Sequence, residues 1–177
     1  MLCLTYRDII DYLTRMDKKD VTITDFAKLW LAHDGLWFQA VEKEFDLETA
    51  IKLDKIAWSK FSPLEADRIL HRLGKQPGGG IELLAEALEE RLYARLNKQR
   101  IIEQTDKKLV FEMTECRVQD ARHRKSLAPF PCKDVGIVEY STFAKAIDPR
   151  IEVHCLHCPP DAYGGQYWCR WEFIIPD

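Results

Sequence analysis

The spacing of hydrophobic residues along the chain changes near residue 100. Before that point, hydrophobic side chains recur every three, four or seven positions, as the buried face of a helix requires. We expect a first helix that begins at Thr5 or Asp8 and ends in the charged run at 17–20. A second helix should begin at Thr24, whose hydroxyl can accept a hydrogen bond from the first turn, with a break at Gly35.

Further helices are predicted between Asp46 and residue 100. Asp46 is the expected N-cap of the next helix, and Ser62-Pro63 should open a short separate helix that Gly74 closes. The Pro- and Gly-rich segment 75–80 cannot continue a helix. After it, leucines at helical spacing predict one long amphipathic helix over 81–100.

After residue 100 the pattern favours strands and shorter helices. We expect strands at 100–105 and 107–115, helices at 116–125 and 133–147, and strands at 150–154 and 167–175. The predicted fold is therefore α+β, with a helical N-terminal half followed by a small antiparallel sheet that carries helices on one face. We divide the chain into a helical region (1–78) and an α+β ligand-binding region (79–177) with a cysteine-rich metal site, which together form one compact unit.

Charge and hydropathy exclude several classes of partner. The chain has 26 Lys and Arg against 29 Asp and Glu, so it lacks the basic surface of a nucleic-acid-binding protein. It contains no apolar run long enough for a membrane span, and acids interrupt the N-terminal segment where a signal peptide needs apolar residues. We therefore expect a cytoplasmic protein with no membrane or nucleic-acid partner.

Cysteines are the unusual feature of the composition, because a chain of 177 residues can form a core without disulfides. Five of the six lie between residues 116 and 169. Cys155 and Cys158 form a C-x2-C pair, which can place two thiolates on one metal ion. The candidate ligands are Cys132, Glu152, Cys155, Cys158 and Cys169. Zinc is the expected cofactor, and an iron–sulfur cluster or buried free thiols are the alternatives.

The C-terminal stretch IEVHCLHCPPDAYGGQYWCRWEFIIP (151–176) resembles the closing strand pair of the 4-vinyl reductase-like small-molecule-binding domains. Phenol-sensing members of that group hold a zinc ion. The resemblance implies that Cys132, Glu152, Cys155 and Cys169 are its ligands here. This chain departs from the pattern by inserting Cys158 and two prolines, so Cys158 is an alternative to Glu152 as a ligand.

A second resemblance covers nearly the whole chain. The matching stretches are HDGLWFQAVE (33–42), AIKLDKIAW (50–58), ECRVQDARHRK (115–125), PCKDVGIVEYSTFAKAIDPRI (131–151) and CLHCPPD (155–161). They are similar to the L-2-amino-thiazoline-4-carboxylic acid hydrolase-like family. The resemblance implies a hydrolase that acts on a C–N or C–S bond of a small cyclic carboxylate, without assigning catalytic residues.

Two groups of side chains outside the metal set are candidates for chemistry. Arg122, on the predicted helix 116–125, can bind a ligand carboxylate through its guanidinium fork, and a solvated basic helix is the alternative. Cys116 is a candidate nucleophile with His123 as its base, although Cys158 with His157 is also open.

Aromatic residues supply the candidate ligand pocket between the helical half and the sheet. His33 and Trp37 are candidate ligand-binding residues, whereas helical spacing favours a core position for Trp37. Glu139 and Tyr140 are interpreted as a surface acid and a half-buried aromatic residue. The expected apolar lining is Trp30, Trp37, Trp58, Phe111 and Phe143.

Three functions are compatible with this sequence. The first is a small-molecule-binding protein with a cysteine-rich zinc site that hydrolyses a C–N or C–S bond. The second is a non-catalytic binding or sensor module, for which a homodimer is an option. The third is a redox or iron–sulfur protein. The expected partner under the first function is a small molecule that carries a carboxylate.

Overall fold

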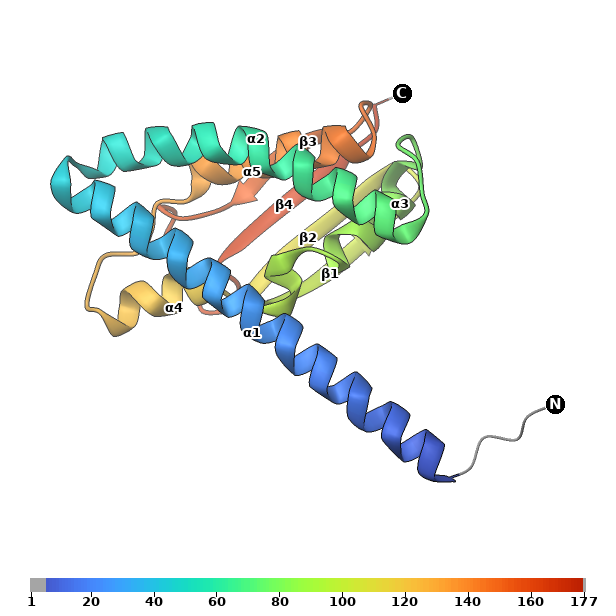
Figure 1. Cartoon of the computed structure of the whole chain (residues 1–177). Helices are drawn as coiled ribbons and strands as arrows, with labels where there is room; N and C mark the ends of the chain where they lie inside the picture. Colours follow the sequence, from blue (N-terminus) through green and yellow to red (C-terminus); the bar gives the residue numbers. More distant parts are fainter. Residues whose placement is uncertain (1–5, 177) are drawn as a thin grey trace.

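The computed structural model describes the backbone of residues 6–176 and the side chains of residues 18–176. The prediction at Thr5 and the isolated Cys3 lie outside these residues. The fold is α+β, as predicted, with a helical first half followed by a four-stranded antiparallel sheet (Figure 1). The elements are α1 (Tyr6–Glu44), α2 (Leu47–Leu73), α3 (Gly80–Glu89), a 3-10 turn (Leu92–Arg95), β1 (Lys98–Gln104), β2 (Lys108–Glu115), α4 (Arg117–Arg124), α5 (Lys133–Ile147), β3 (Glu152–His157) and β4 (Cys169–Ile174).

Helix α1 is a single continuous helix of 39 residues. The predicted end at 17–20 and the predicted break at Gly35 are therefore wrong. Charged side chains are good helix formers when they face solvent, and residues 18–20 are exposed. Gly35 costs about 1 kcal/mol relative to Ala, which is too little to end a helix whose flanking turns pack against the protein.

Helix α2 begins and ends as predicted but is not divided. The Asp46 carboxylate accepts a hydrogen bond from the Thr49 amide at 2.6 Å, and Gly74 ends the helix with a φ of 66°. Pro63 lies inside α2, so the prediction of a new helix there is wrong. Proline inside a helix removes one hydrogen bond, but Ala66 and Ile69 in the following turns are buried in the core and keep the helix continuous.

Helix α3 is shorter than predicted, ending at Glu89 instead of residue 100. Immediately after it, the buried Arg91 pairs with Glu65 of α2, and the Leu92 amide donates to the same carboxylate at 3.1 Å. These contacts with α2 end the helix, although Leu92 and Leu96 continue the helical spacing of the leucines before them. The 3-10 turn then leads into β1, which begins before the predicted strand.

The sheet has the order β1-β2-β4-β3, with all neighbours antiparallel. The predicted hairpin, the helices at 116–125 and 133–147 and the last two strands are confirmed within a few residues. Helices α2, α3 and α5 lie along one face of this sheet (Figure 1). On that face, Met113 of β2 pairs with Cys169 of β4, and Cys155 of β3 pairs with Trp171 of β4.

One hydrophobic core joins both regions of the chain. Ile69 and Leu70 of α2 lie in the same buried cluster as Leu84 of α3 and as Phe111 and Trp171 of the sheet. Residues on either side of position 78 therefore bury their side chains together. Among the described residues, no helix is both long enough and apolar enough to cross a membrane.

The outer surfaces of α1 and α2 expose large hydrophobic side chains. They include Phe26, Leu29 and Leu36 of α1 and Leu53 and Ile56 of α2. Trp37 is 69% exposed, so the core position predicted for it is wrong. Helix α1 therefore carries apolar side chains on more than one face, and only part of them is buried against the rest of the protein.

Close packing of Gly136 of α5 against Trp171 leads to a stability prediction. A Cβ atom at Gly136 would lie 2.7 Å from Cζ2 of the buried Trp171 ring. Gly136→Ala should lower the free energy of unfolding by about 1–3 kcal/mol, because this overlap exceeds the gain in helix propensity. Urea denaturation followed by circular dichroism measures the change. Gly164→Ala is the control, since its Cβ would meet no atom within 4 Å, and equal effects of the two substitutions would contradict the prediction.

Candidate functional site

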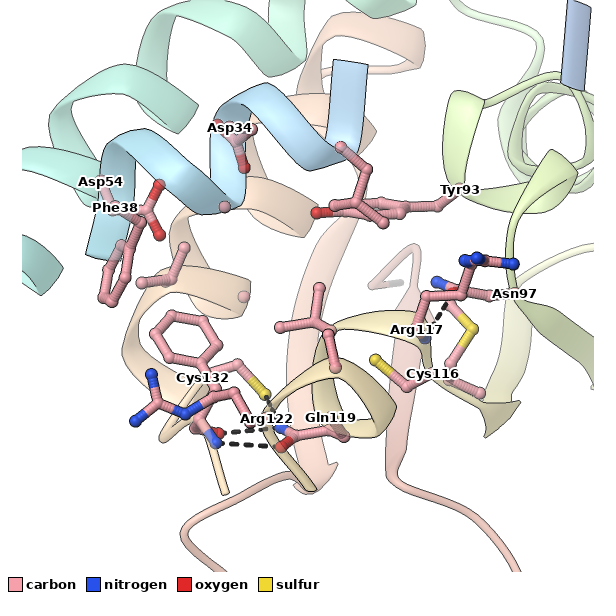
Figure 2. Close-up of a pocket in the computed structure, with 18 of the residues that line it drawn as sticks. Asp34, Phe38, Asp54, Tyr93, Asn97, Cys116, Arg117, Gln119, Arg122 and Cys132 are labelled. Carbon is pink, nitrogen blue, oxygen red and sulfur yellow. Dashed lines mark hydrogen bonds between the residues drawn. The ribbon is translucent and has the colours of Figure 1, made fainter. Parts of the chain in front are cut away.

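A cavity of about 410 Å³ lies between the helices and the sheet. Its walls come from α1, α2, the 3-10 turn, α4, α5 and the ends of β2 and β4. Figure 2 shows Asp34, Asp54 and Phe38 on one side, with Gln119, Arg122 and Cys132 on the opposite side. The cavity therefore has an acidic side and a side formed by α4 and the cysteines.

Aromatic side chains form much of the cavity wall. Tyr93 stacks on Trp58 with ring centroids 5.7 Å apart, and Phe38 meets Phe130 edge to face at 5.0 Å. Of the aromatic residues predicted as lining, only Trp58 is confirmed. The others, Trp30, Trp37, Phe111 and Phe143, do not line the cavity.

The acidic side of the cavity is formed by Asp34, Asp54 and Glu139. The pKa of Asp54 is raised to about 7, mainly by burial and also by the nearby carboxyls of Asp34 and Glu139, against a hydrogen bond from Trp58 that lowers it. Burial also raises the pKa of Asp34 and of Glu139. This side of the cavity can therefore hold and release a proton near neutral pH.

Glu139 and its neighbour Tyr140 are both buried, so their interpretation as a surface acid and a half-buried aromatic residue is wrong. Glu139 Oε1 lies 2.8 Å from the Arg91 guanidinium, which also pairs with Glu65 at 2.8 Å. The sequence contained a signal for this position: Val135, Glu139 and Phe143 follow one another at intervals of four, which places Glu139 on the buried face of α5.

Arg122 lines the cavity, but its guanidinium fork already has a partner. It donates two hydrogen bonds to the Glu42 carboxylate, at 3.0 and 3.2 Å, and a third to the Ala128 carbonyl at 2.7 Å. The expected role in binding a ligand carboxylate is therefore not supported by the geometry. Arg122 instead ties α4 to α1 and closes this end of the cavity.

The candidate nucleophile and base are not brought together. Cys116 lines the cavity, whereas His123 is exposed and lies outside its lining, seven residues and about 10 Å further along α4. Burial raises the pKa of the Cys116 thiol to about 12, so it is a weak nucleophile at neutral pH. The structure gives no support to a Cys116–His123 catalytic pair.

His33 and Trp37 were expected to bind the ligand, but both are exposed and neither lines the cavity. The lining residues of the same segment are Asp34, Gly35 and Phe38. The prediction found the correct turns of α1 but the wrong face, about 100° away around the helix. Gly35 is not a helix break, yet it borders the cavity, and a Cβ there would meet only Gln39 Nε2, at 3.9 Å.

Four cysteines gather at the base of the cavity. Cys158 is 1% exposed, and its thiol interacts electrostatically with the thiols of Cys132, Cys155 and Cys169. The Cys132 and Cys158 Sγ atoms are 3.4 Å apart. These residues come from the N-cap of α5, from β3, from the turn after β3 and from the start of β4. As placed, the described side chains form no group of three or more His, Cys, Asp or Glu that could hold a metal ion.

Glu152 does not join the cysteines. Along β3, residues 152, 154 and 156 are exposed, whereas 153, 155 and 157 are partly buried against the rest of the protein. Successive side chains of a strand point to opposite faces, so Glu152 and Cys155 face opposite ways. Cys158, the alternative to Glu152, is the residue that lies near Cys132, Cys155 and Cys169.

Comparison with known families identifies a relationship for this chain. A family model described as "Family of unknown function (DUF6125)" matches residues 13–175. The chain belongs to the DUF6125 family. No curated protein and no solved structure matches it.

The buried Asp54 makes stability depend on pH. An aspartate in the unfolded chain ionises near pH 4, whereas Asp54 in the folded protein keeps its proton until about pH 7. Between these values the folded state binds the extra proton, so the contribution of Asp54 to the free energy of unfolding falls as pH rises.

Asp54→Asn should remove this loss and make the variant more stable than the parent at pH 8 by up to about 4 kcal/mol, with a smaller difference at pH 5. Urea denaturation at both values measures it. Asp67→Asn, at an exposed position on the same helix, is the control. A difference for Asp54→Asn that does not grow between pH 5 and pH 8 would contradict the assignment.

Proposed function

We propose that the protein binds a small organic molecule in the cavity and holds a zinc ion at the adjacent cysteines. The observation that carries the first part is the cavity itself, about 410 Å³ in volume, with aromatic walls and a few carboxyl and amide groups. Natural ligand sites combine these properties, since apolar walls supply affinity and a few polar groups orient the ligand. The relationship to the hydrolase-like and 4-vinyl reductase-like families is part of this proposal.

The zinc proposal rests on Cys132, Cys155, Cys158 and Cys169. Four sulfurs bound tetrahedrally at about 2.3 Å from one zinc ion are about 3.8 Å apart, and the separation of 3.4 Å between Cys132 and Cys158 is only slightly smaller. Four thiolates leave no open position, so the ion would be structural. It would tie α5 to the ends of β3 and β4. An iron–sulfur cluster would use the same thiolates and is the alternative.

Cys158→Ser should remove the metal, because this buried thiol lies 3.4 Å from that of Cys132 and interacts with those of Cys155 and Cys169. Metal analysis of protein purified without chelator should give about one zinc per chain for the parent and much less for the variant. Cys116→Ser is the matched control and should retain its zinc, since Cys116 lies near Cys132 and Cys169 but is not one of the four proposed ligands.

Cobalt substitution provides a second measurement that does not depend on stability. The parent and Cys116→Ser should show the absorption of cobalt bound to four thiolates, and Cys158→Ser should not. A metal-free parent, or zinc retained in a folded Cys158→Ser variant, would contradict the proposal.

Ligand binding can be tested by filling the cavity from α1. Gly35→Leu should place a side chain in the open space beside Gly35 and weaken binding of the fluorescent probe N-phenyl-1-naphthylamine by about ten-fold or more, without unfolding a helix that gains propensity. Ala40→Leu, at an exposed position on the same helix, is the control. Equal probe binding by the two variants would contradict the cavity as the binding site.

Hydrolysis of a C–N or C–S bond is the second candidate function. Asp54 is the observation that favours it, because a carboxyl with a pKa of about 7 in a ligand cavity suits general acid–base catalysis. In this proposal Asp54 replaces Cys116 and His123 as the group that transfers protons. The substrate would be a small ring compound bound against Trp58 and Phe38.

We also propose that the protein forms a homodimer and is located in the cytoplasm. The exposed apolar side chains of α1 and α2, including Phe26, Leu29 and Ile56, are supporting evidence for a second copy packed against these helices. The five cysteines between residues 116 and 169 are free thiols, which suits a reducing compartment.

A further inference from the structure

We infer that the ligand of the cavity carries a protonated amine on an aromatic or other apolar body. This inference rests on the proposed function, since it names the class of molecule that the cavity binds. It replaces the expectation of a ligand carboxylate, because the arginine fork proposed to bind one is occupied by Glu42.

The first argument is the balance of buried charge. Arg91 is the cation paired with both Glu65 and Glu139, so one positive charge serves two carboxylates. Asp34 and Asp54 take no part in the ion pairs of Arg91 and Arg122, and the neighbouring His33 lowers the pKa of Asp34 against the larger, raising effect of burial. Yet these two carboxyls lie close enough to each other and to Glu139 to interact electrostatically. Charged groups removed from water require compensation, which either a proton or a bound cation can supply.

The second argument is the position of the cavity's own cations. Arg122 is paired with Glu42 and Lys125 with Gln39, and Arg117 lies beside Asn97, across the cavity from Asp54 (Figure 2). Lys28 and Arg124 also border the cavity but are exposed to solvent. The acidic side has the Arg91 cation beside Glu139, but neither Arg91 nor Arg122 pairs with Asp34 or Asp54. A ligand that binds beside these two residues therefore contacts carboxyl groups.

The third argument concerns Trp171, which lines the cavity and is 1% exposed. Its Nε1 has no hydrogen-bond partner among the described residues. A buried N–H without an acceptor costs about 1–3 kcal/mol, and such groups in native proteins commonly mark a missing ligand or water. This observation points to an occupied cavity and is independent of the carboxyl groups.

The kind of cation follows from the surroundings. The carboxyls of Asp34 and Asp54 lie in a wall that is otherwise largely apolar and aromatic, which suits an organic cation. An alkylammonium group can bind in such surroundings, because it donates up to three hydrogen bonds and interacts with aromatic faces such as those of Trp58 and Tyr93. A volume of about 410 Å³ leaves room for an attached aromatic ring against Phe38 and Trp171.

Three probes of nearly equal size test the inference at pH 8, where Asp54 is mostly ionised: 2-phenylethylamine, 2-phenylethanol and phenylacetate. Binding to the full chain is measured by isothermal titration calorimetry. The amine should bind about ten-fold more tightly than the alcohol, and the carboxylate should bind most weakly. Equal or tighter binding of the alcohol or the carboxylate would overturn the inference.

Asp54→Asn should reduce the preference for the amine over the alcohol to about three-fold or less. Asp67→Asn should keep the full preference. A preference that survives in a folded double variant, Asp34→Asn with Asp54→Asn, would place the amine elsewhere and overturn the inference. If N-phenyl-1-naphthylamine binds but the amine does not, this inference alone fails. If neither the three probes nor the dye binds, the proposed function fails with it.

Discussion

The rest of the structure depends on the buried guanidinium of Arg91, which joins helix α2 to helix α5. It pairs with Glu65 of α2 and Glu139 of α5, and it lies 4.6 Å from the centre of the Phe143 ring. Removing one partner from such a group leaves a buried charge uncompensated, at a typical cost of about 3–5 kcal/mol. Arg91 thereby fixes the approach of α2 to α5, ends the helical path after α3 and sets the charge of the cavity wall at Glu139.

The position of the cavity follows from that arrangement. Helix α5 presents Glu139 to Arg91 and, one turn earlier, Gly136 to the ring of Trp171, so the helix lies close to the sheet. Arg122 and Glu42 then close the opposite end by joining α4 to α1. The Arg91 bridge between Glu65 and Glu139 and the ion pair between Glu42 and Arg122 join residues far apart in sequence. Together they enclose a space lined by helices and strands from both halves of the chain.

The sequence correctly predicted the parts of the fold that depend on interactions between residues close together in the chain. The N-cap at Asp46, the stop at Gly74 and helix α5 depend on neighbouring residues, and the sequence was sufficient to find them. The extent of α3 and the unbroken path through Pro63 depend on contacts with distant elements, and spacing alone favoured the wrong answer at both. For the site, the sequence indicated four cysteines that do lie together, but it wrongly added Glu152 to them. It also predicted ligand-binding residues, His33 and Trp37, on the solvent-exposed face of α1. It also assigned Glu139 to the surface, because its partner Arg91 is 48 positions earlier in the chain.

The continuity of α1 has a mechanical consequence. At 1.5 Å per residue, its 39 residues form a rod about 58 Å long, and its first turns project beyond the rest of the protein (Figure 1). The same rod carries Asp34, Gly35 and Phe38 on the wall of the cavity. A rotation of the projecting end about the helix axis is transmitted to those three positions, because no hinge interrupts the hydrogen bonds between them. The outer end of α1 is thus joined to the cavity wall by an uninterrupted helix.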